Sequence, residues 1–133
     1  SEHVMVVHGL DGLDEISVSA KTTVCELANG ELTHYEIDPA VFGHAHDSVA
    51  DLCVDDAEES AALIRAALGG DTSDRSAKAR SIIAMNAGAG LYVGGQAGSL
   101  EAGIELAMDA MHSGSALQTL EAFAELTQAV GGA

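Results

Sequence analysis

The chain has 133 residues, of which 47% are hydrophobic, with 15 glycines, one proline and no tryptophan. This length and composition allow one domain with a buried core and exclude a disordered tail or a collagen-like repeat. The net charge of −16, with only five Lys and Arg residues, disfavours nucleic acid and anionic membrane surfaces as partners.

The compartment is predicted from the apolar runs and the cysteines. No apolar run approaches the length of a membrane-spanning helix, and no basic segment followed by an apolar one opens the chain. Cys25 and Cys53 are too few for a disulfide framework and lack metal-ligand spacing. These observations predict a cytoplasmic protein with reduced cysteines. A salt-rich cytoplasm is one open explanation for the acidic composition, and basic residues supplied from outside this chain are another.

The first predicted elements are strands. Residues 3–8 (HVMVVH) form an apolar, β-branched run that is typical of a strand buried on both faces of a parallel sheet. Gly9 and Gly12 then mark a loop, and residues 16–20 (ISVSA) predict a second strand. Ile16 and Val18 would share one face of that strand because side chains alternate along it.

A β-hairpin is predicted over residues 23–37. Asn29-Gly30 lies between two strand-like runs and favours a type I′ turn, which requires positive φ at both residues. Pairing through this turn sets Leu27 opposite Leu32. Both faces of the hairpin carry apolar groups, so we expect both to be covered.

Helices follow the strands, within residues 56–130. Asp56 is a good N-cap for a helix that Gly69-Gly70 ends. A second helix is predicted from about Ser76 into the early nineties. A third opens at Ser99, and Gly114 separates it from a fourth.

This order of elements predicts the C-terminal part of a larger α/β domain, with a mixed sheet followed by about four helices. A strand buried on both faces needs neighbours, whereas the strands predicted after it are joined as hairpins, which supply no parallel crossover. We therefore expect the whole of residues 1–133 to be one segment of that domain.

Two adjacent acids, Asp14 and Glu15, follow the first loop. In an extended strand they would point to opposite faces, so they can share one ion only if the chain turns there. Mg²⁺ typically takes one or two protein carboxylates and completes its shell with water and phosphate oxygens. From the spacing alone, an ordinary solvated acidic turn is the favoured interpretation, because charged pairs in loops are usually solvated.

Residues 86–98 (NAGAGLYVGGQAG) are rich in glycine. The spacing Gly88-x-Gly90-x-x-x-Gly94 differs from a dinucleotide-binding motif and continues a helical pattern, so it predicts close packing between helices. Asn86 lies in this apolar helix and must find hydrogen-bond partners, which predicts a tether from the helix to a loop.

The histidines give weaker predictions. His44 and His46, with Asp47, have a spacing that could hold a metal, but no third ligand follows, so surface positions are favoured. His8 ends the first strand beside the acidic loop, where it either orients a ligand or forms a structural hydrogen bond. The sequence contains no nucleophile triad pattern and no EF-hand loop.

Four stretches, read in order, resemble the C-terminal portion of the anthranilate phosphoribosyltransferases. They are VMVVHGLDGLDEIS (4–17), NGELTHYEIDPAVFG (29–43), DAEESAALIRAALGG (56–70) and the segment 85–123 that begins MNAGAGLYV. The first stretch is the most specific to that family. The chain departs from the family pattern at residues 53–55, where the family often has Gly-Gly, and at Ser60, where it usually has Asn.

The resemblance implies a function. Members of the family transfer the phosphoribosyl group of phosphoribosyl pyrophosphate to the amino group of anthranilate in tryptophan biosynthesis, and pyrophosphate leaves. The family's adjacent Asp and Glu hold Mg²⁺, and they map onto Asp14 and Glu15. The resemblance also implies a nucleoside-phosphorylase/phosphoribosyltransferase-like fold.

The parts of that family that this chain lacks are also implied by the resemblance. They are the N-terminal helical domain, through which a homodimer would form, and the first half of the α/β domain with its Gly-Thr-Gly-Gly-Asp phosphate loop. We therefore expect this chain to be inactive alone. Two alternatives stay open: an enzyme like pyrimidine nucleoside phosphorylase, against which the Asp14-Glu15 loop argues, and a non-catalytic acidic interaction module.

Overall fold

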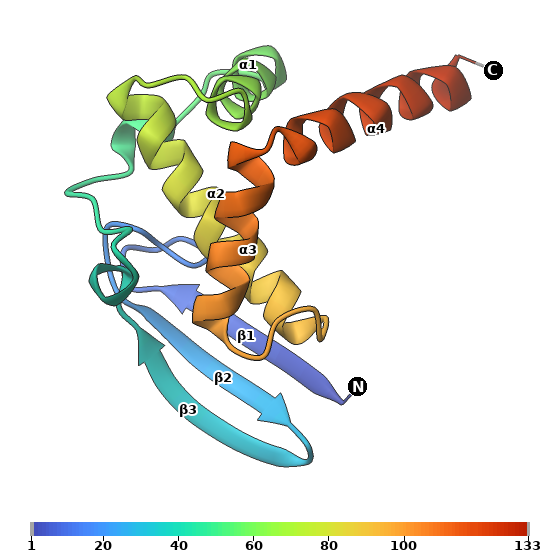
Figure 1. The fold of residues 1–133 in the computed structure, drawn as a ribbon. Coiled ribbons are helices and arrows are strands. Elements are labelled where there is room, and N and C mark those ends of the chain that lie inside the picture. Colours follow the sequence, from blue (N-terminus) through green and yellow to red (C-terminus); the bar gives the residue numbers. More distant parts are fainter. Residues whose placement is uncertain (1, 133) are drawn as a thin grey trace.

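The structure, a computed structural model, describes residues 2–132. Its strands are β1 (His3–Gly9), β2 (Thr22–Ala28) and β3 (Glu31–Ile37), and its α-helices are α1 (Ala57–Leu68), α2 (Asp74–Val93), α3 (Leu100–His112) and α4 (Ser115–Gly131). Figure 1 shows α2 and α3 packed across the sheet, with α1 beyond the sheet and α4 projecting away from the rest. This arrangement confirms the predicted α/β class and the four helices. Among the described helices, none combines the length and apolar character that crossing a bilayer requires.

The sheet has the strand order β1-β2-β3, and both pairs of neighbours are antiparallel. The predicted hairpin is confirmed: Asn29 and Gly30 have φ values of 52° and 81°, and Leu27 lies opposite Leu32. Within residues 2–132 the sheet is antiparallel throughout rather than mixed, because β1 joins β2 through a loop instead of a parallel crossover.

The prediction of two-sided burial was wrong for β1 and for the hairpin. The inner face of the sheet packs on α2, but Val6 on the outer face of β1 is 64% exposed and Leu32 on β3 is 59% exposed. An unbroken apolar run indicates burial on both faces, yet no described residue covers this outer face enough to bury these two side chains.

The prediction of a strand over residues 16–20 was also wrong. Ile16 and Val18 are buried, as their apolar character indicates, but the segment forms no ladder with any described strand. Its backbone groups bind side chains instead: the amide of Ser17 donates to Thr22 Oγ1 at 3.0 Å, and Ile16 binds Asn86. Side-chain partners therefore replace strand pairing here.

Helix capping follows the sequence closely. Asp56 Oδ1 accepts a hydrogen bond from the amide of Glu59 at 2.8 Å, and Ser99 Oγ accepts one from Ala102 at 3.1 Å. Gly114, with φ of 81°, separates α3 from α4 as predicted. α2 begins at Asp74, two residues before the predicted Ser76, because Ser73 provides the N-cap.

The glycines of α2 allow α3 to approach closely, as predicted. A Cβ atom added to Gly88 would lie 2.6 Å from the backbone nitrogen of Ile104, and one added to Gly103 would overlap the carbonyl oxygen of Gly88. A Cβ atom at Gly90 would meet nothing within 4 Å. Gly88 and Gly103 thus serve helix packing rather than phosphate binding.

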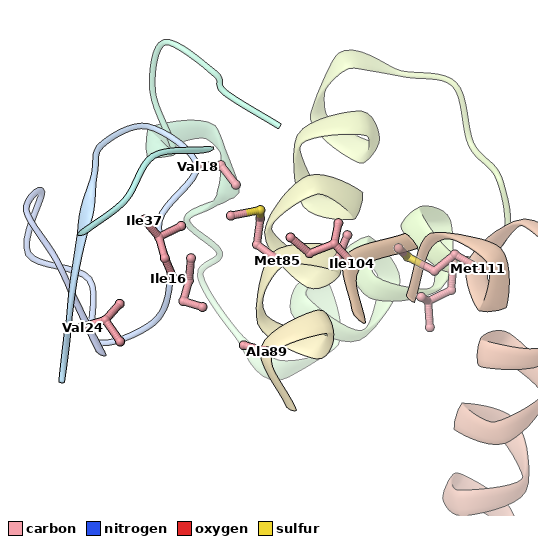
Figure 2. Close-up of a cluster of buried hydrophobic side chains, with 10 residues drawn as sticks. Ile16, Val18, Val24, Ile37, Met85, Ala89, Ile104 and Met111 are labelled. Atoms are coloured by element: carbon pink, nitrogen blue, oxygen red, sulfur yellow. The ribbon is translucent and has the colours of Figure 1, made fainter. Parts of the chain in front are cut away.

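The hydrophobic core lies between the sheet and the α2–α3 pair. Figure 2 shows Met85 of α2 at its centre, with Ile16 and Ile37 on the sheet side and Ile104 on the α3 side. Met85 is fully buried and Ile16 is 1% exposed. Because Ile16 belongs to the loop after β1, the core fixes one end of the acidic loop against α2.

Candidate functional site

The candidate site is the loop of residues 10–21, which joins β1 to β2 and carries the two adjacent acids. Backbone hydrogen bonds close its base: the amide of Gly9 donates to the carbonyl of Leu13 at 2.8 Å, and the amide of Leu10 donates to that of Lys21 at 2.8 Å. The chain therefore turns tightly just before Asp14.

Asp11, although exposed, holds the loop together through its carboxylate. Its carboxylate accepts hydrogen bonds from Ser17 Oγ at 2.5 Å and from Ser19 Oγ at 2.7 Å. Desolvation raises the pKa of Asp11, but hydrogen bonds from the two serine hydroxyls and from backbone amides lower it more, so the net pKa lies below its ordinary value. This role could not be predicted from the sequence, since no local pattern links an Asp to serines six and eight residues later.

Asn86 holds the other side of the loop, which confirms the predicted tether from helix to loop. Its Oδ1 accepts from the amide of Ile16 at 2.9 Å, and its Nδ2 donates to the carbonyl of Ile16 at 2.9 Å. The same Nδ2 donates to the carbonyl of Ile82 within α2, also at 2.9 Å. The residue after the acidic pair is thus fixed to the helix at two points.

Asp14 and Glu15 lie between these braces and are both exposed. Neither carboxylate makes a hydrogen bond or ion pair with another residue of the described chain. Glu15 also borders a groove of about 450 Å³ between α1 and α2. Its other lining residues are mainly apolar: Leu52, Val54, Ser60, Leu63, Ile64, Ala79, Ile82, Ile83 and Asn86.

The donor chemistry of this pair fits Mg²⁺ better than zinc. Within residues 2–132, no three His, Cys, Asp or Glu side chains gather as a set that could hold a metal by itself. Two carboxylates would leave most positions of an octahedral ion to water and phosphate oxygens, which is the usual arrangement for Mg²⁺. Structural zinc, in contrast, requires four protein ligands of the Cys or His type.

His44 and His46 share one structural contact with α2. His44 Nδ1 and His46 Nε2 both lie within hydrogen-bond distance of Ser81 Oγ on α2, at 3.2 Å and 2.9 Å. Burial and the neighbouring His46 lower the pKa of His44. Both side chains are half-buried, so they are less exposed than the predicted surface positions implied. His8 is exposed, and its carbonyl accepts from Thr23 Oγ1 at 3.2 Å.

A buried carboxylate that was not predicted lies on the inner face of the sheet. Glu26 is 7% exposed and binds three side chains from three other elements. Its oxygens lie 2.7 Å from His3 Nε2, 2.6 Å from the Tyr35 hydroxyl and 2.9 Å from the Tyr92 hydroxyl. The sequence places Glu26 on the same face of β2 as Val24, because side chains alternate along a strand, but it does not show the partners that allow a carboxylate to be buried there.

This cluster predicts a pH-dependent stability. Burial raises the pKa of Glu26, but the hydrogen bonds it accepts, led by that from Tyr35, lower it more. Because the folded pKa lies below the unfolded value, Glu26 stabilises the fold above pH 4.5 and loses this effect as the pH falls through its folded pKa. We expect Glu26→Gln to lower the free energy of unfolding by about 2 kcal/mol at neutral pH. We also expect the free energy of unfolding of this variant to fall less steeply than that of the wild type as the pH is lowered.

Urea denaturation at several pH values measures this effect. Glu36→Gln is the matched control, since Glu36 pairs with Lys21 at 3.6 Å while both side chains are about half exposed. An equally steep fall in the free energy of unfolding at acid pH in wild type and Glu26→Gln would contradict the prediction.

Comparisons with known proteins give consistent results. Residues 1–117 match the family model described as "Glycosyl transferase family, a/b domain". The anthranilate phosphoribosyltransferase of Teredinibacter turnerae is 49% identical over 127 residues, which cover 96% of this chain and 37% of that protein. The chain thus spans little more than a third of the length of such relatives.

Two solved structures are also similar. The anthranilate phosphoribosyltransferase of Thermus thermophilus superposes with a TM-score of 0.76 at 34% identity, over 91% of this chain and 34% of that one. The enzyme of Saccharomyces cerevisiae in complex with PRPP and Mg superposes with a TM-score of 0.71 at 26% identity, over 88% of this chain and 33% of that one.

Proposed function

Because the chain belongs to the glycosyl transferase family through its a/b domain, we propose that it forms the magnesium-binding part of an anthranilate phosphoribosyltransferase. The observation that carries the proposal is the pair of exposed carboxylates, Asp14 and Glu15, on a loop braced from both sides. This loop occurs in a chain that is 49% identical to an enzyme of that name.

The proposed reaction joins the amino nitrogen of anthranilate to C1 of the ribose of phosphoribosyl pyrophosphate. The bond from C1 to the diphosphate oxygen breaks, pyrophosphate leaves with the bonding electrons, and the nitrogen releases a proton. A bound Mg²⁺ would neutralise negative charge on the leaving diphosphate. Asp14 and Glu15 would hold that ion, and the amine needs little activation once it is positioned against C1.

The remainder of the active site must come from other residues. With five Lys and Arg against 21 Asp and Glu, this chain alone repels a diphosphate. The proposal assigns the basic residues and the phosphate loop to the part of the relatives that this chain does not span. It assigns a homodimer contact to their N-terminal helical domain. The reaction is placed in the cytoplasm, in keeping with two free cysteines.

A chimera tests this function. The 133 residues of this chain replace the matching segment of the Teredinibacter turnerae relative, and the consumption of anthranilate is followed with phosphoribosyl pyrophosphate and Mg²⁺. We expect transfer by the chimera and none by the isolated chain. Transfer by the isolated chain would overturn the proposed division of the site.

The same chimera distinguishes the two alternatives. Phosphorolysis of a pyrimidine nucleoside, without transfer to anthranilate, would replace the proposal with a nucleoside phosphorylase. A folded chimera with neither activity would favour a non-catalytic acidic module, for which substitution of Asp14 and Glu15 leaves partner binding intact.

A further inference from the structure

We propose that Asn86 is a positioning residue for the metal-binding pair, acting through the backbone of Ile16. The inference rests on the proposed function, since it assumes that Asp14 and Glu15 bind a divalent cation. Asn86 lies on α2 and is 70 positions along the chain from Ile16, the loop residue that it holds.

The hydrogen bonds of Asn86 define one orientation of its amide. Oδ1 faces the amide of Ile16, and Nδ2 faces the carbonyls of Ile16 and Ile82, each at 2.9 Å. Exchanging the oxygen and nitrogen would place donor against donor and acceptor against acceptor. The hydrogen bond to Ile82 fixes the Asn86 side chain to its own helix. The side-chain amide of Asn86 therefore holds Ile16 in a fixed position relative to α2.

Ile16 is the residue directly after Glu15, and its side chain is 1% exposed in the core beside Met85. Asn86 holds both the backbone amide and the backbone carbonyl of Ile16. The position of the Glu15 carboxylate therefore depends on this contact. Asn86 also lines the same groove as Glu15. Partners that orient metal ligands without touching the metal typically contribute 10- to 100-fold to metal affinity.

The test uses Mn²⁺ as a paramagnetic probe on the chimera with pyrophosphate present, because most of the ligands of the ion would be water and phosphate oxygens. Its affinity is read from the broadening of the backbone amide signals of Asp14 and Glu15. Broadening that is lost in the double variant Asp14→Asn, Glu15→Gln defines the specific site, because a chain of charge −16 also attracts cations elsewhere. We expect Asn86→Ala to weaken Mn²⁺ binding at this site at least about tenfold.

A second variant and a matched control separate positioning from folding. Asn86→Asp keeps the acceptor for the Ile16 amide but loses both donors, so we expect an intermediate loss of affinity. Tyr92→Phe, also on α2, removes the hydroxyl that donates to Glu26. We expect it to lower the melting temperature while leaving Mn²⁺ binding unchanged. Hydrogen exchange of the Ile16 amide should quicken in Asn86→Ala and not in Tyr92→Phe.

Two outcomes overturn the inference, and they are distinguishable. If wild type binds Mn²⁺ at Asp14 and Glu15 and both Asn86 variants bind equally well, Asn86 has only a structural role and the proposed function stands. If wild-type signals at Asp14 and Glu15 do not broaden at all, the metal site fails, and with it both the inference and the proposed function.

Discussion

Replacing Asp14 by Asn and Glu15 by Gln in the chimera is expected to lower the rate of phosphoribosyl transfer at least about 100-fold. The substitutions keep the size of both side chains and remove only the charge that would hold Mg²⁺. A 100-fold loss corresponds to about 2.7 kcal/mol of transition-state stabilisation, which is within the range for a metal that neutralises a leaving group. Steady-state rates at saturating phosphoribosyl pyrophosphate and a series of Mg²⁺ concentrations measure the effect.

The structure predicts that this loss comes without a loss of folding. Both acids are exposed and have no partner among residues 2–132, so surface substitutions here should change the free energy of unfolding by less than about 0.5 kcal/mol. Glu31→Gln with Asp47→Asn is the control, since it neutralises two exposed acids outside the loop. A double variant of Asp14 and Glu15 that keeps its Mg²⁺-dependent activity would refute the assigned site.

Gly103→Ala is expected to destabilise the fold by about 3 kcal/mol, at the upper end of the usual cost of overpacking. The added Cβ atom would overlap the carbonyl oxygen of Gly88 and would lie 3.0 Å from its carbonyl carbon. Both obstacles are backbone atoms of helices, which cannot move aside as a flexible side chain can. The helices α2 and α3 would have to separate, and the core around Met85 would lose its packing.

Gly90→Ala is the matched control for this prediction. Gly90 also lies in α2, but a Cβ atom there meets nothing within 4 Å. Because alanine has the higher helix propensity, we expect a gain of up to about 1 kcal/mol. Urea denaturation followed by circular dichroism measures both variants. Equal stabilities for Gly103→Ala and Gly90→Ala would show that the two helices do not depend on the close approach.

Features determined by a few neighbouring residues could be predicted from the sequence. The caps at Asp56 and Ser99 and the Asn29-Gly30 turn depend on local backbone geometry, and all of them are confirmed. The tether made by Asn86 was predicted for a different reason: a polar side chain in an apolar helix must be satisfied. The resemblance to the anthranilate phosphoribosyltransferases is confirmed by relatives at 49% identity.

Features that depend on distant partners could not be predicted. Residues 16–20 have the composition of a strand, but the side chain of Asn86 takes the place of a neighbouring strand. Glu26 is buried because Tyr35 and Tyr92, from β3 and α2, reach its carboxylate. In both cases the decisive group lies on another element, so a short window of sequence does not contain it.

At the loop after β1, the residues that fix the backbone differ from the residues that present free carboxylates. Asp11 and Asn86 determine its shape through hydrogen bonds within the protein, whereas Asp14 and Glu15 take no part in that bonding. The ion-binding chemistry proposed for this turn can therefore be redesigned by changing two side chains, for instance toward a softer metal, while the hydrogen bonds that shape the loop stay as they are.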